Sequence, residues 1–558
     1  MKTKNSAKLY KKIGMKRQAT LGGAVLICVV WQLMSLWAEA QETNTLEIIK
    51  QLQKRIEDLE NNPLQKRIEA LEEKIKRLEN DKQAAQQAID ARLNERTQEL
   101  EQRFNNLQRT RDSDSKQQIE ALNKQVKVLQ RNRELDQEAA ETKAKEAARI
   151  SVGKENFSLA SADKSYNLQL KGVLQIDSRT FFEDSHIVGN DSILLRRARP
   201  VLQGTVARDF DFLFVPDFGG TSSPQIFDAY VNYRYNAALQ LQAGKSKSPI
   251  GLEALVQDVD LPFNERALPT DLVPGRDLGI QLHGDLWDGS ISYAAGVFNG
   301  VGDARNTSNF DFEDNKAFEG RIFFQPFKKT SIDALQGFGF GLGGSYERMQ
   351  GTNVTGLPAT TGGALAGYAT DGQQQFFAYN PSSNAVVVAD GEHWRLSPQG
   401  YYYYGPFGLL AEYVISDQRV SRTVTKPYAS GRLDNRAWEI TGSWIVTGEE
   451  AAYRGGVTPR HPFNPRQGEW GALQLVGRYA ELSIDDAAFP LYSNPSTSAR
   501  AARTWSGGLN WYLNKNVLVK ANFSHTEFSG GGGAGTSAPA AVTQKDENVF
   551  FTRIQLSF

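Results

Sequence analysis

The chain has 558 residues, and its 64 lysines and arginines balance its 64 aspartates and glutamates, so its charge gives no reason to expect a nucleic-acid partner. A single cysteine, Cys28, excludes a disulfide scaffold and a cysteine-ligated metal site from the chain that follows it. The mean hydropathy of -0.47 would argue against a membrane protein, but a β-barrel escapes this test because its lipid-facing residues alternate with polar ones.

Residues 1–40 resemble a secretory signal peptide. An apolar stretch from Leu21 to Leu36 precedes Ala38-Glu39-Ala40, an A-x-A cleavage site that would leave Gln41 as the mature N-terminus. The stretch follows a basic segment that contains Lys8, Lys11, Lys12, Lys16 and Arg17. The alternative is an uncleaved inner-membrane anchor, because the apolar stretch is about long enough to cross a bilayer.

Residues 41–150 are rich in Glu, Gln, Lys, Arg, Leu and Ala, and they predict an α-helical coiled coil in the periplasm. Apolar residues recur at alternating intervals of three and four, which is the a/d pattern of a heptad. The three runs are Ile49-Leu52-Ile56-Leu59, Leu64-Ile68-Leu71-Ile75-Leu78 and Ile119-Leu122-Val126-Leu129. Pro63 separates the first two runs, and the alternatives are a solvated single helix or a disordered charged spacer.

From residue 151 to residue 558 the apolar period changes to two, and the last segment shows the change best. Phe550, Ile554, Leu556 and Phe558 share one face with Thr552, while Arg553, Gln555 and Ser557 occupy the other. Alternation over about ten residues is typical of a membrane β-strand. The terminal aromatic residue is also common in outer-membrane barrels.

About sixteen such segments predict an all-β fold, a sixteen-stranded antiparallel transmembrane barrel preceded by the coiled coil. The expected strand centres are residues 173, 199, 213, 230, 242, 281, 294, 321, 342, 398, 412, 440, 476, 507, 521 and 553. Short links, such as Asn236-Ala237 and Tyr404-Gly405-Pro406, become periplasmic turns, and long links become extracellular loops. The alternative, a soluble β-sandwich or solenoid, would leave the outward Trp and Phe rows unexplained.

The chain carries no strong catalytic or metal-binding motif, so we expect a protein that is not an enzyme and needs no metal or cofactor. Residues 339–344 formally fit a dinucleotide fingerprint, but their glycines alternate with aromatic residues and no helix follows. The five histidines are scattered along the chain. An enzyme embedded in the barrel, such as a lipase, remains the alternative.

Arginines in the second strand indicate an anion path. Strict alternation puts Arg197 and Arg199 on one face and Arg196 on the other, unless a bulge near Pro200 turns Arg196 inward. Charge is costly on the lipid face, so these side chains should face the pore, where guanidinium groups match oxyanions. The alternative is a structural cluster paired with acidic loop residues.

The long insertion from Lys247 to Gly275 should fold into the lumen. It carries Arg266 together with acidic residues, which predicts a constriction of mixed sign with a transverse field. The acidic residues are Glu253, Asp258, Asp260 and Glu265.

Seven motifs in order resemble the phosphate-selective porin O and P family over residues 165–558. They are Leu170 to Asp177, Leu195 to Arg199 with Arg208-Asp209-Phe210, Ala243-Gly244-Lys245 with Pro249 to Glu253, Glu265 to Leu268, Pro274-Gly275-Arg276, Thr441 to Glu449, and Asn510 to Asn514. The resemblance implies a homotrimer of sixteen-stranded barrels in the outer membrane of a Gram-negative bacterium, with Arg196, Arg197 and Arg266 matching basic residues of the family's constriction.

The sequence departs from the phosphate-specific members of the family at three positions. Val173 stands where they carry an arginine, and Asp258 and Asp260 stand where they place lysine. Broader anion passage that includes small carboxylates fits what remains, and some relatives with an N-terminal coiled coil are described as dicarboxylate channels.

We therefore expect passive diffusion of small anions, such as phosphate or similar oxyanions, through an arginine-lined constriction. The candidate pore residues are Arg179, Arg196, Arg197, Arg199, Lys245, Lys247 and Arg266. One alternative is a general or dicarboxylate porin with weak selectivity. Another is a tether whose coiled coil contacts peptidoglycan or another periplasmic partner, with a secondary pore.

Overall fold

The computed structural model describes residues 92–93, 95–104, 113–146, 148–151, 157–182, 191–220, 223–304, 306–307, 314–350, 365, 367–380, 387–422, 429–530 and 546–558. The chain divides into two compact units, Met1–Ala140 and Glu141–Phe558. The expected division at residues 40 and 150 stays a prediction.

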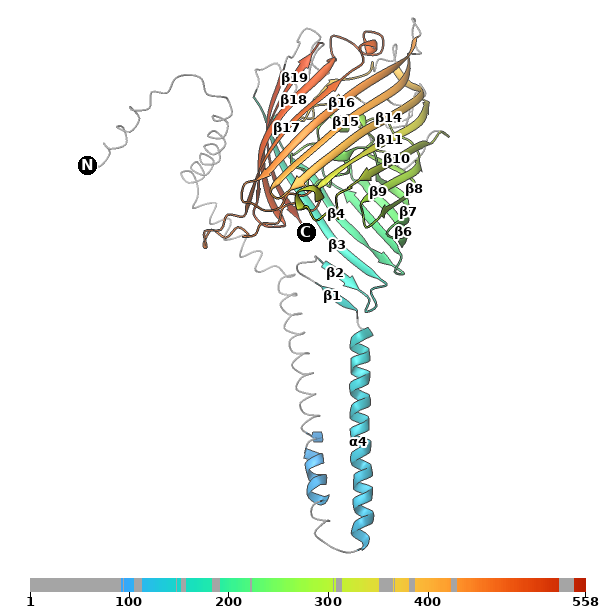
Figure 1. Cartoon of the computed structure of the whole chain (residues 1–558), viewed down its shortest axis with the longest axis vertical. Helices are drawn as coiled ribbons and strands as arrows, with labels where there is room; N and C mark the ends of the chain where they lie inside the picture. The colour runs from blue at the N-terminus through green and yellow to red at the C-terminus, as the bar shows by residue number, and fades with distance from the viewer. Residues whose placement is uncertain are drawn as a thin grey trace, which may run out of the picture. The chain divides into compact units, whose positions relative to one another are not determined.

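The described part of the first unit is helical (Figure 1). Helix α4 (Ser113–Glu146) begins in this unit and contains the third apolar run, in which Ile119, Leu122 and Val126 are less exposed than their neighbours. Helix is thus confirmed there, whereas pairing into a coiled coil stays a prediction. The signal peptide and the first two apolar runs lie outside the described residues. Among the described helices, none is long and apolar enough to span a membrane.

The second unit is a closed antiparallel β-barrel. Within the described residues the main sheet has 18 strands, and the sixteen from β3 to β20, without β12 and β13, close when β20 pairs with β3. They are β3 (Asn167–Phe181), β4 (Ser192–Val206), β5 (Phe210–Asp217), β6 (Gln225–Asn236), β7 (Leu239–Lys247), β8 (Arg276–Leu286), β9 (Ile291–Phe298), β10 (Ala317–Phe324), β11 (Phe338–Gln350), β14 (Val387–Tyr404), β15 (Phe407–Arg422), β16 (Ala429–Ile445), β17 (Ala472–Ser483), β18 (Ala501–Tyr512), β19 (Val517–Ser529) and β20 (Asp546–Ser557). Each of the sixteen predicted centres falls inside one of them, so the predicted barrel is confirmed.

Short elements outside the barrel wall were not predicted. Strands β1 (Arg149–Ser151) and β2 (Phe157–Ala160) form a hairpin, and β2 pairs with the first residues of β3, which β20 does not reach. The remaining elements lie in links between wall strands. They are β12 (Tyr368–Ala369), β13 (Gln375–Phe377), α5 (Leu252–Leu255), the 3-10 helices η1 (Leu268–Leu272) and η2 (Asp486–Ala488), and α6 (Asp333–Gln336).

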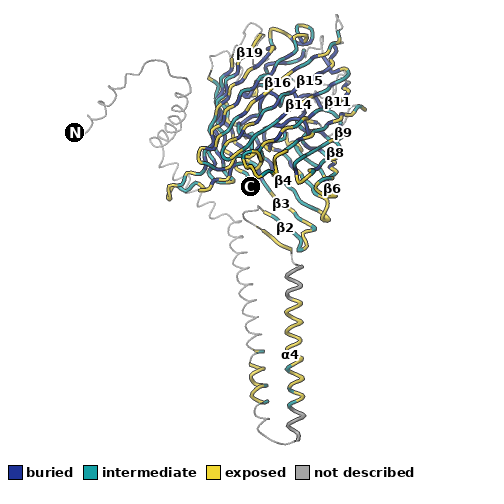
Figure 2. Tube along the Cα trace, in the orientation of Figure 1, coloured by how far each residue is buried: buried dark blue, intermediate teal, exposed yellow. Residues whose placement is uncertain are grey.

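Burial alternates along the wall strands (Figure 2). The buried residues that face the lumen are largely polar, whereas the exposed outer residues are largely apolar. In β20, Arg553 and Gln555 are buried, whereas Ile554 and Leu556 are exposed on the outside. Trp438, Trp444 and Trp505 are likewise exposed, in agreement with the outward Trp rows that the alternation predicted. Lipid can cover such rows, and closure of the sheet pairs the backbone groups that lipid cannot satisfy.

The links divide the barrel into two ends. At the short-turn end most links are brief, such as residues 237–238 and 405–406. Two links overturn the expectation that long links lie only at the other end: the β10–β11 link, residues 325–337, and the β16–β17 link, residues 446–471, join their strands at the short-turn end. The long-loop end carries further long links, among them residues 248–275, which we call the inward loop.

Glycines on the inner face of β11 make room for what fills the lumen. A Cβ at Gly343 would lie 2.2 Å from the carbonyl oxygen of Ile250 in the inward loop, and one at Gly341 would lie 2.6 Å from the ring of Phe323. The glycine-rich run therefore lies in a strand, and its glycines permit close packing.

Candidate functional site

The inward loop crosses the lumen and is held by side chains from widely separated strands. Its residues are largely buried, and wall side chains donate hydrogen bonds to its backbone carbonyls, which would otherwise be unpaired. These hydrogen bonds run from the side chain of Gln175 to the carbonyl of Asp258 (3.1 Å), from Gln555 to Val259 (3.1 Å), from Asn510 to Pro262 (2.8 Å), from Lys520 to Leu261 and Phe263, and from Gln399 to Ile250 (2.7 Å). The predicted folding of this segment into the lumen is confirmed.

Asp258 in the inward loop binds three arginines. Its Oδ1 lies 2.6 Å from Nη1 of Arg266 on the same loop, and its Oδ2 contacts Nη1 of Arg199 and lies 3.4 Å from Nε of Arg197, both on β4. Burial raises the pKa of the Asp258 carboxyl, but the three guanidinium charges outweigh burial and hold this pKa well below its usual value. Asp258 is therefore ionised at neutral pH.

Glu265 in the inward loop binds two further arginines. Arg196 donates to both of its carboxylate oxygens, from Nε (2.7 Å) and from Nη2 (2.9 Å), and Nη2 of Arg179 lies 3.2 Å from Oε1. Burial raises the pKa of Glu265, but the attraction and hydrogen bonds of Arg196, with help from Arg197 and Arg179, lower it below the usual value. This carboxylate is also ionised.

A β-bulge turns Arg196 into the lumen. Across the β3–β4 ladder Gln175 pairs with Arg197 and Ile176 pairs with Leu195, so Arg196 is the extra residue. Pro200, which suggested a bulge nearby, stays in register opposite Gly172. The bulge therefore lies at Arg196 itself, where it allows two consecutive arginines to face inward.

The five arginines form one group, which we call the basic cluster: Arg179, Arg196, Arg197, Arg199 and Arg266. In the described part of the chain they share three carboxylates, those of Asp258, Glu265 and Asp217, whose Oδ2 lies 2.6 Å from Nε of Arg199. The cluster therefore keeps a positive excess. Its side chains differ in access: 21 % of Arg196, 17 % of Arg266 and 12 % of Arg179 are exposed, against 4 % and 7 % of Arg197 and Arg199.

The two candidate lysines take different positions. Nζ of Lys247 donates to the carbonyls of Ala254 (2.8 Å) and Val256 (2.6 Å) in the inward loop. Lys245 is buried, and its Nζ donates to the carbonyl of Thr307 (2.8 Å). Lys247 thus joins the inward loop, whereas Lys245 lies apart from it.

Carboxylates gather on the wall opposite the basic cluster. Glu412 on β15 accepts the backbone N–H groups of Leu252 (2.8 Å) and Glu253 (3.1 Å), and Arg478 on β17 lies 3.4 Å from Oε1 of Glu253. The remaining buried carboxylates on this side include Glu319, Glu347 and Glu439, with Arg395 as a further cation. The lumen therefore has the mixed sign that the sequence predicted.

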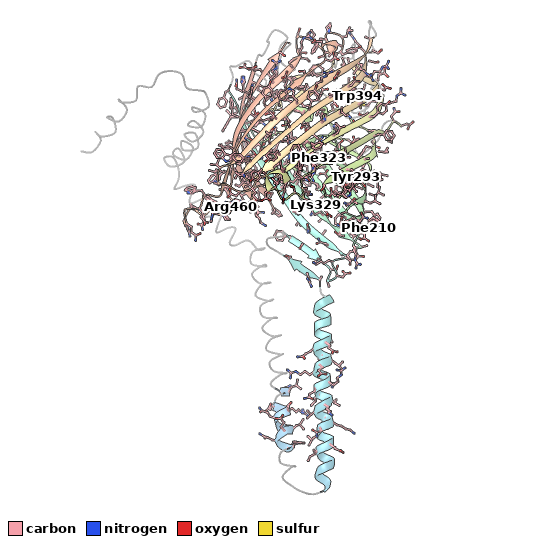
Figure 3. All side chains as sticks on the ribbon, in the orientation of Figure 1. Phe210, Tyr293, Phe323, Lys329, Trp394 and Arg460 are labelled. Carbon is pink, nitrogen blue, oxygen red and sulfur yellow. The ribbon has the colours of Figure 1, made fainter. Side chains whose placement is uncertain are left out.

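Sequence analysis did not assign roles to Arg321, Arg395 or Arg478. Each stands alone in a strand without a motif, so only its inward register could have indicated a lumen position. Arg321 lines a cavity of about 1350 Å³ at the short-turn end, below the inward loop, together with Lys247 and Tyr401. Figure 3 labels Phe323, a second lining residue, in this region.

Among the residues that the structure describes, no group of His, Cys, Asp or Glu side chains has an arrangement that could hold a metal ion. The His393 ring instead lies between acidic partners, 3.1 Å from Glu347 and 3.4 Å from Asp303. The arrangement that remains is a polar lumen narrowed by charged side chains.

A comparison with protein families matches residues 168–558 to the family described as phosphate-selective porin O and P. A search of curated proteins finds no match.

Similar solved structures include outer-membrane proteins of three bacteria. The trimer form of OmpT from Vibrio cholerae shares 10% identity at a TM-score of 0.44, over 71% of this chain and 100% of that one. The anion-selective porin from Comamonas acidovorans shares 12% identity at 0.42, over 70% and 100%. The outer membrane channel DcaP of Acinetobacter baumannii shares 11% identity at 0.44, over 71% and 98%.

Proposed function

This chain belongs to the phosphate-selective porin O and P family, and we propose that it lets small anions, phosphate or similar oxyanions among them, diffuse through its outer-membrane barrel past the basic cluster. The barrel and the family together make it an outer-membrane porin. Beyond this assignment as a porin, we propose a preference for anions. It requires no chemical reaction, because a channel needs only sites that bind the ion weakly and release it.

The observation that carries the proposal is the positive excess of the basic cluster beside the inward loop. Arg196, Arg266 and Arg179 are each bound to a carboxylate yet keep part of their side-chain surface exposed. A guanidinium has five N–H donors in a planar fork, so one that pairs with a loop carboxylate can still offer donors to a passing oxyanion. Arg197 and Arg199, which are more deeply buried, would hold the loop in place.

The neighbouring residues favour a broader class of anions than phosphate alone. Val173 faces inward on β3 without a charge, and Asp258 neutralises part of the cluster. Both features reduce the positive potential that a multiply charged anion would require. Small carboxylates are therefore proposed as additional substrates.

A general porin with weak selectivity is the second candidate, and one observation favours it. Each arginine of the basic cluster has a carboxylate partner, as expected for a structural cluster that anchors the inward loop. In that case the arginines would hold the loop, and the lumen would discriminate by size.

The reversal potential of the purified protein in a planar bilayer, under a potassium chloride gradient, separates the two candidates. The anion-path proposal predicts a reversal potential that lies toward the equilibrium potential of chloride. It also predicts that phosphate or succinate blocks the chloride current. Arg196→Gln and Arg266→Gln should each weaken that block about tenfold, because a charge-assisted hydrogen bond contributes about 1.5–3 kcal/mol. Arg234→Gln is the matched control, since Arg234 pairs with Asp211 outside the constriction.

A potential near zero, with no block by either anion, would reject the anion path and leave the general porin. Block by succinate without block by phosphate would assign the channel to organic acids. Unchanged block in both cluster variants would move the selectivity away from Arg196 and Arg266.

We also propose that the mature protein is a homotrimer in the outer membrane, with residues 41–150 as a periplasmic coiled coil after removal of residues 1–40. Deletion of residues 45–150 tests the role of this segment. A porin would keep its conductance without it, whereas a tether would lose its attachment to peptidoglycan. Cross-linking of the intact protein tests the trimer.

A further inference from the structure

The cavity of about 1350 Å³ at the short-turn end has a wall of stacked aromatic rings. Phe323 on β10 and Tyr401 on β14 stack with their ring centroids 4.9 Å apart, and Tyr401 stacks on Tyr453 of the β16–β17 link at 4.8 Å. Tyr403 meets Tyr401 edge to face at 5.5 Å. The sequence brings these rings from three separate segments to one side of the cavity.

Hydrogen bonds and packing fix this ring stack in place. Tyr453 donates its hydroxyl to the carbonyl of Leu252 in the inward loop (2.7 Å), which joins the β16–β17 link to the loop. A Cβ at Gly339 would lie 2.6 Å from the Phe323 ring, so glycine there leaves space for the ring. The stack is therefore a preformed part of the lumen.

Two arginines cover the ends of the stack without forming an ion pair within the described residues. The guanidinium carbon of Arg321 lies 4.4 Å from the Phe323 ring centroid, and that of Arg454 lies 5.4 Å from the Tyr453 ring centroid. Within the described part of the chain, the Arg321 side chain makes one hydrogen bond, from Nε to Oε1 of Gln399 (2.8 Å). These arginines differ from those of the basic cluster, each of which has a carboxylate partner.

The charges near Tyr453 agree with this placement. Burial raises the pKa of the Tyr453 hydroxyl to about 12, and the positive charges of Arg321 and Arg454 act in the opposite direction. The acidic residues that line the cavity include Asp285, Asp333 and Glu450. Asp285 already accepts a hydrogen bond from Ser292, and Asp333 accepts one from Gln336. The ring side of the cavity thus combines aromatic rings with two guanidinium groups, with Glu412 as an acidic neighbour of Tyr453 and Arg321.

Such a wall matches a particular ligand chemistry. Stacking covers the ring faces with one another and with the two guanidinium groups, so the ring edges, which carry partial positive charge, remain for an anionic ligand. Within the described residues the hydroxyls of Tyr401 and Tyr403 form no hydrogen bond, so both can donate. A flat apolar body would cover the ring edges, and a guanidinium would bind a carboxylate in a bidentate manner. Inorganic phosphate would use only the second feature.

We propose that this cavity, between Arg321, Arg454 and the rings of Phe323, Tyr401 and Tyr453, is a binding site for aromatic carboxylates on their way through the barrel. The proposal rests on the proposed function, because it names a substrate class of the same channel. It places a second site in series with the basic cluster, on the short-turn side of the inward loop. Several weak sites in series let an anion leave as easily as it enters.

Calorimetric titration of the full-length protein in detergent with benzoate, acetate and phosphate tests the site without relying on conductance. Benzoate should bind about tenfold more tightly than acetate, because only benzoate uses the ring wall. Arg321→Gln and Arg454→Gln should each weaken benzoate binding about tenfold. Tyr401→Leu should remove the difference between benzoate and acetate.

Arg466→Gln is the matched control, because Arg466 lies in the same β16–β17 link, is exposed and does not line the cavity. If Arg321→Gln does not fold, Arg454→Gln tests the charge alone from its exposed position in the link.

Equal binding of benzoate and acetate, or benzoate binding that neither arginine substitution weakens, would overturn the inference. Reversal potentials distinguish this failure from failure of the proposed function. An anion-selective channel that binds both acids equally keeps the function and loses the site. If the channel is non-selective but still binds benzoate through Arg321 and Arg454, the anion-path proposal is rejected and the proposed binding site is retained.

Discussion

Asp258 sets how much positive charge the basic cluster presents to the lumen. One carboxylate neutralises part of three guanidinium groups, and the excess that remains depends on it. The same contacts attach the inward loop to β4, so Asp258 has both a structural and an electrostatic effect. A single substitution separates these effects, because they are measured in different ways.

We expect Asp258→Asn to shift the reversal potential further toward anion selectivity and to lower the free energy of unfolding by about 3–5 kcal/mol. Breaking a buried ion pair leaves charge without compensation, which explains both directions. Bilayer recordings and urea unfolding measure the two effects. Asp288→Asn is the control, because Asp288 is exposed and pairs with Lys329 at the short-turn end. An unchanged reversal potential would show that Asp258 does not limit the cluster's charge.

At the scale of elements, two loops from the long-loop end fill the upper lumen together. Residues 367–380 pack on the inward loop through an apolar group that includes Leu268, Leu272, Phe376 and Phe377. The backbone N–H of Ala369 also donates to Oδ2 of Asp271 (2.9 Å). The contact between the two loops therefore combines buried apolar side chains with the carboxyl group of Asp271, which has acidic neighbours.

We predict that this loop contact weakens as the pH rises. Burial, with added repulsion from Asp371 and Asp303, raises the pKa of Asp271 to about 8 in the folded protein. In the unfolded chain this carboxyl group is ionised above about pH 4, whereas in the folded protein it ionises only near pH 8. The contribution of Asp271 to the free energy of unfolding therefore falls as the pH rises from about 4 to about 8 and then levels off. Urea unfolding at pH 5, 7 and 9 should show this slope.

Asp271→Asn should reduce the slope, because an amide keeps the acceptor for Ala369 without the charge. Asp486→Asn should leave it unchanged, since Asp486 is exposed and pairs with Arg500. The same slope in Asp271→Asn as in the native protein would assign the pH dependence to other groups.

At the scale of the whole molecule, the barrel depends on closure between its first and last strands. Phe558 follows β20, and its backbone exchanges two hydrogen bonds with Gly172 on β3, at 3.0 and 3.1 Å. Its ring lies over Gly172 and meets Phe157 of the β1–β2 hairpin edge to face at 6.1 Å. The last residue of the sequence therefore joins three strands at the seam.

Gly172→Ala should destabilise this seam by about 1–3 kcal/mol, because a Cβ there would lie 2.6 Å from the Phe558 ring. The fraction of barrel that resists unfolding in cold detergent, read from its electrophoretic mobility, measures the effect. Gly477→Ala on β17 is the control, since a Cβ there meets nothing within 4 Å. Equal resistance of the two variants would exclude a role for the ring in closure.

The sequence by itself determined the barrel. Lipid imposes alternation on each membrane strand and excludes unpaired strand edges, so period, strand number and inward faces could be read locally. It also indicated that residues 248–275 fold inward and that the arginines of β4 face the lumen. The helical conformation of α4 followed in the same way from its apolar spacing.

Only the tertiary structure decided which charges meet. Asp258 and Arg197 are far apart in the chain, and no local pattern predicts that one carboxylate binds three arginines. The bulge at Arg196, the hydrogen bond from Lys245 to Thr307 and the ring stack at Tyr401 depend on strand register and on loops that fold back toward the strands. Side-chain period is a local property, whereas pairing across a lumen is set by closure of the whole sheet.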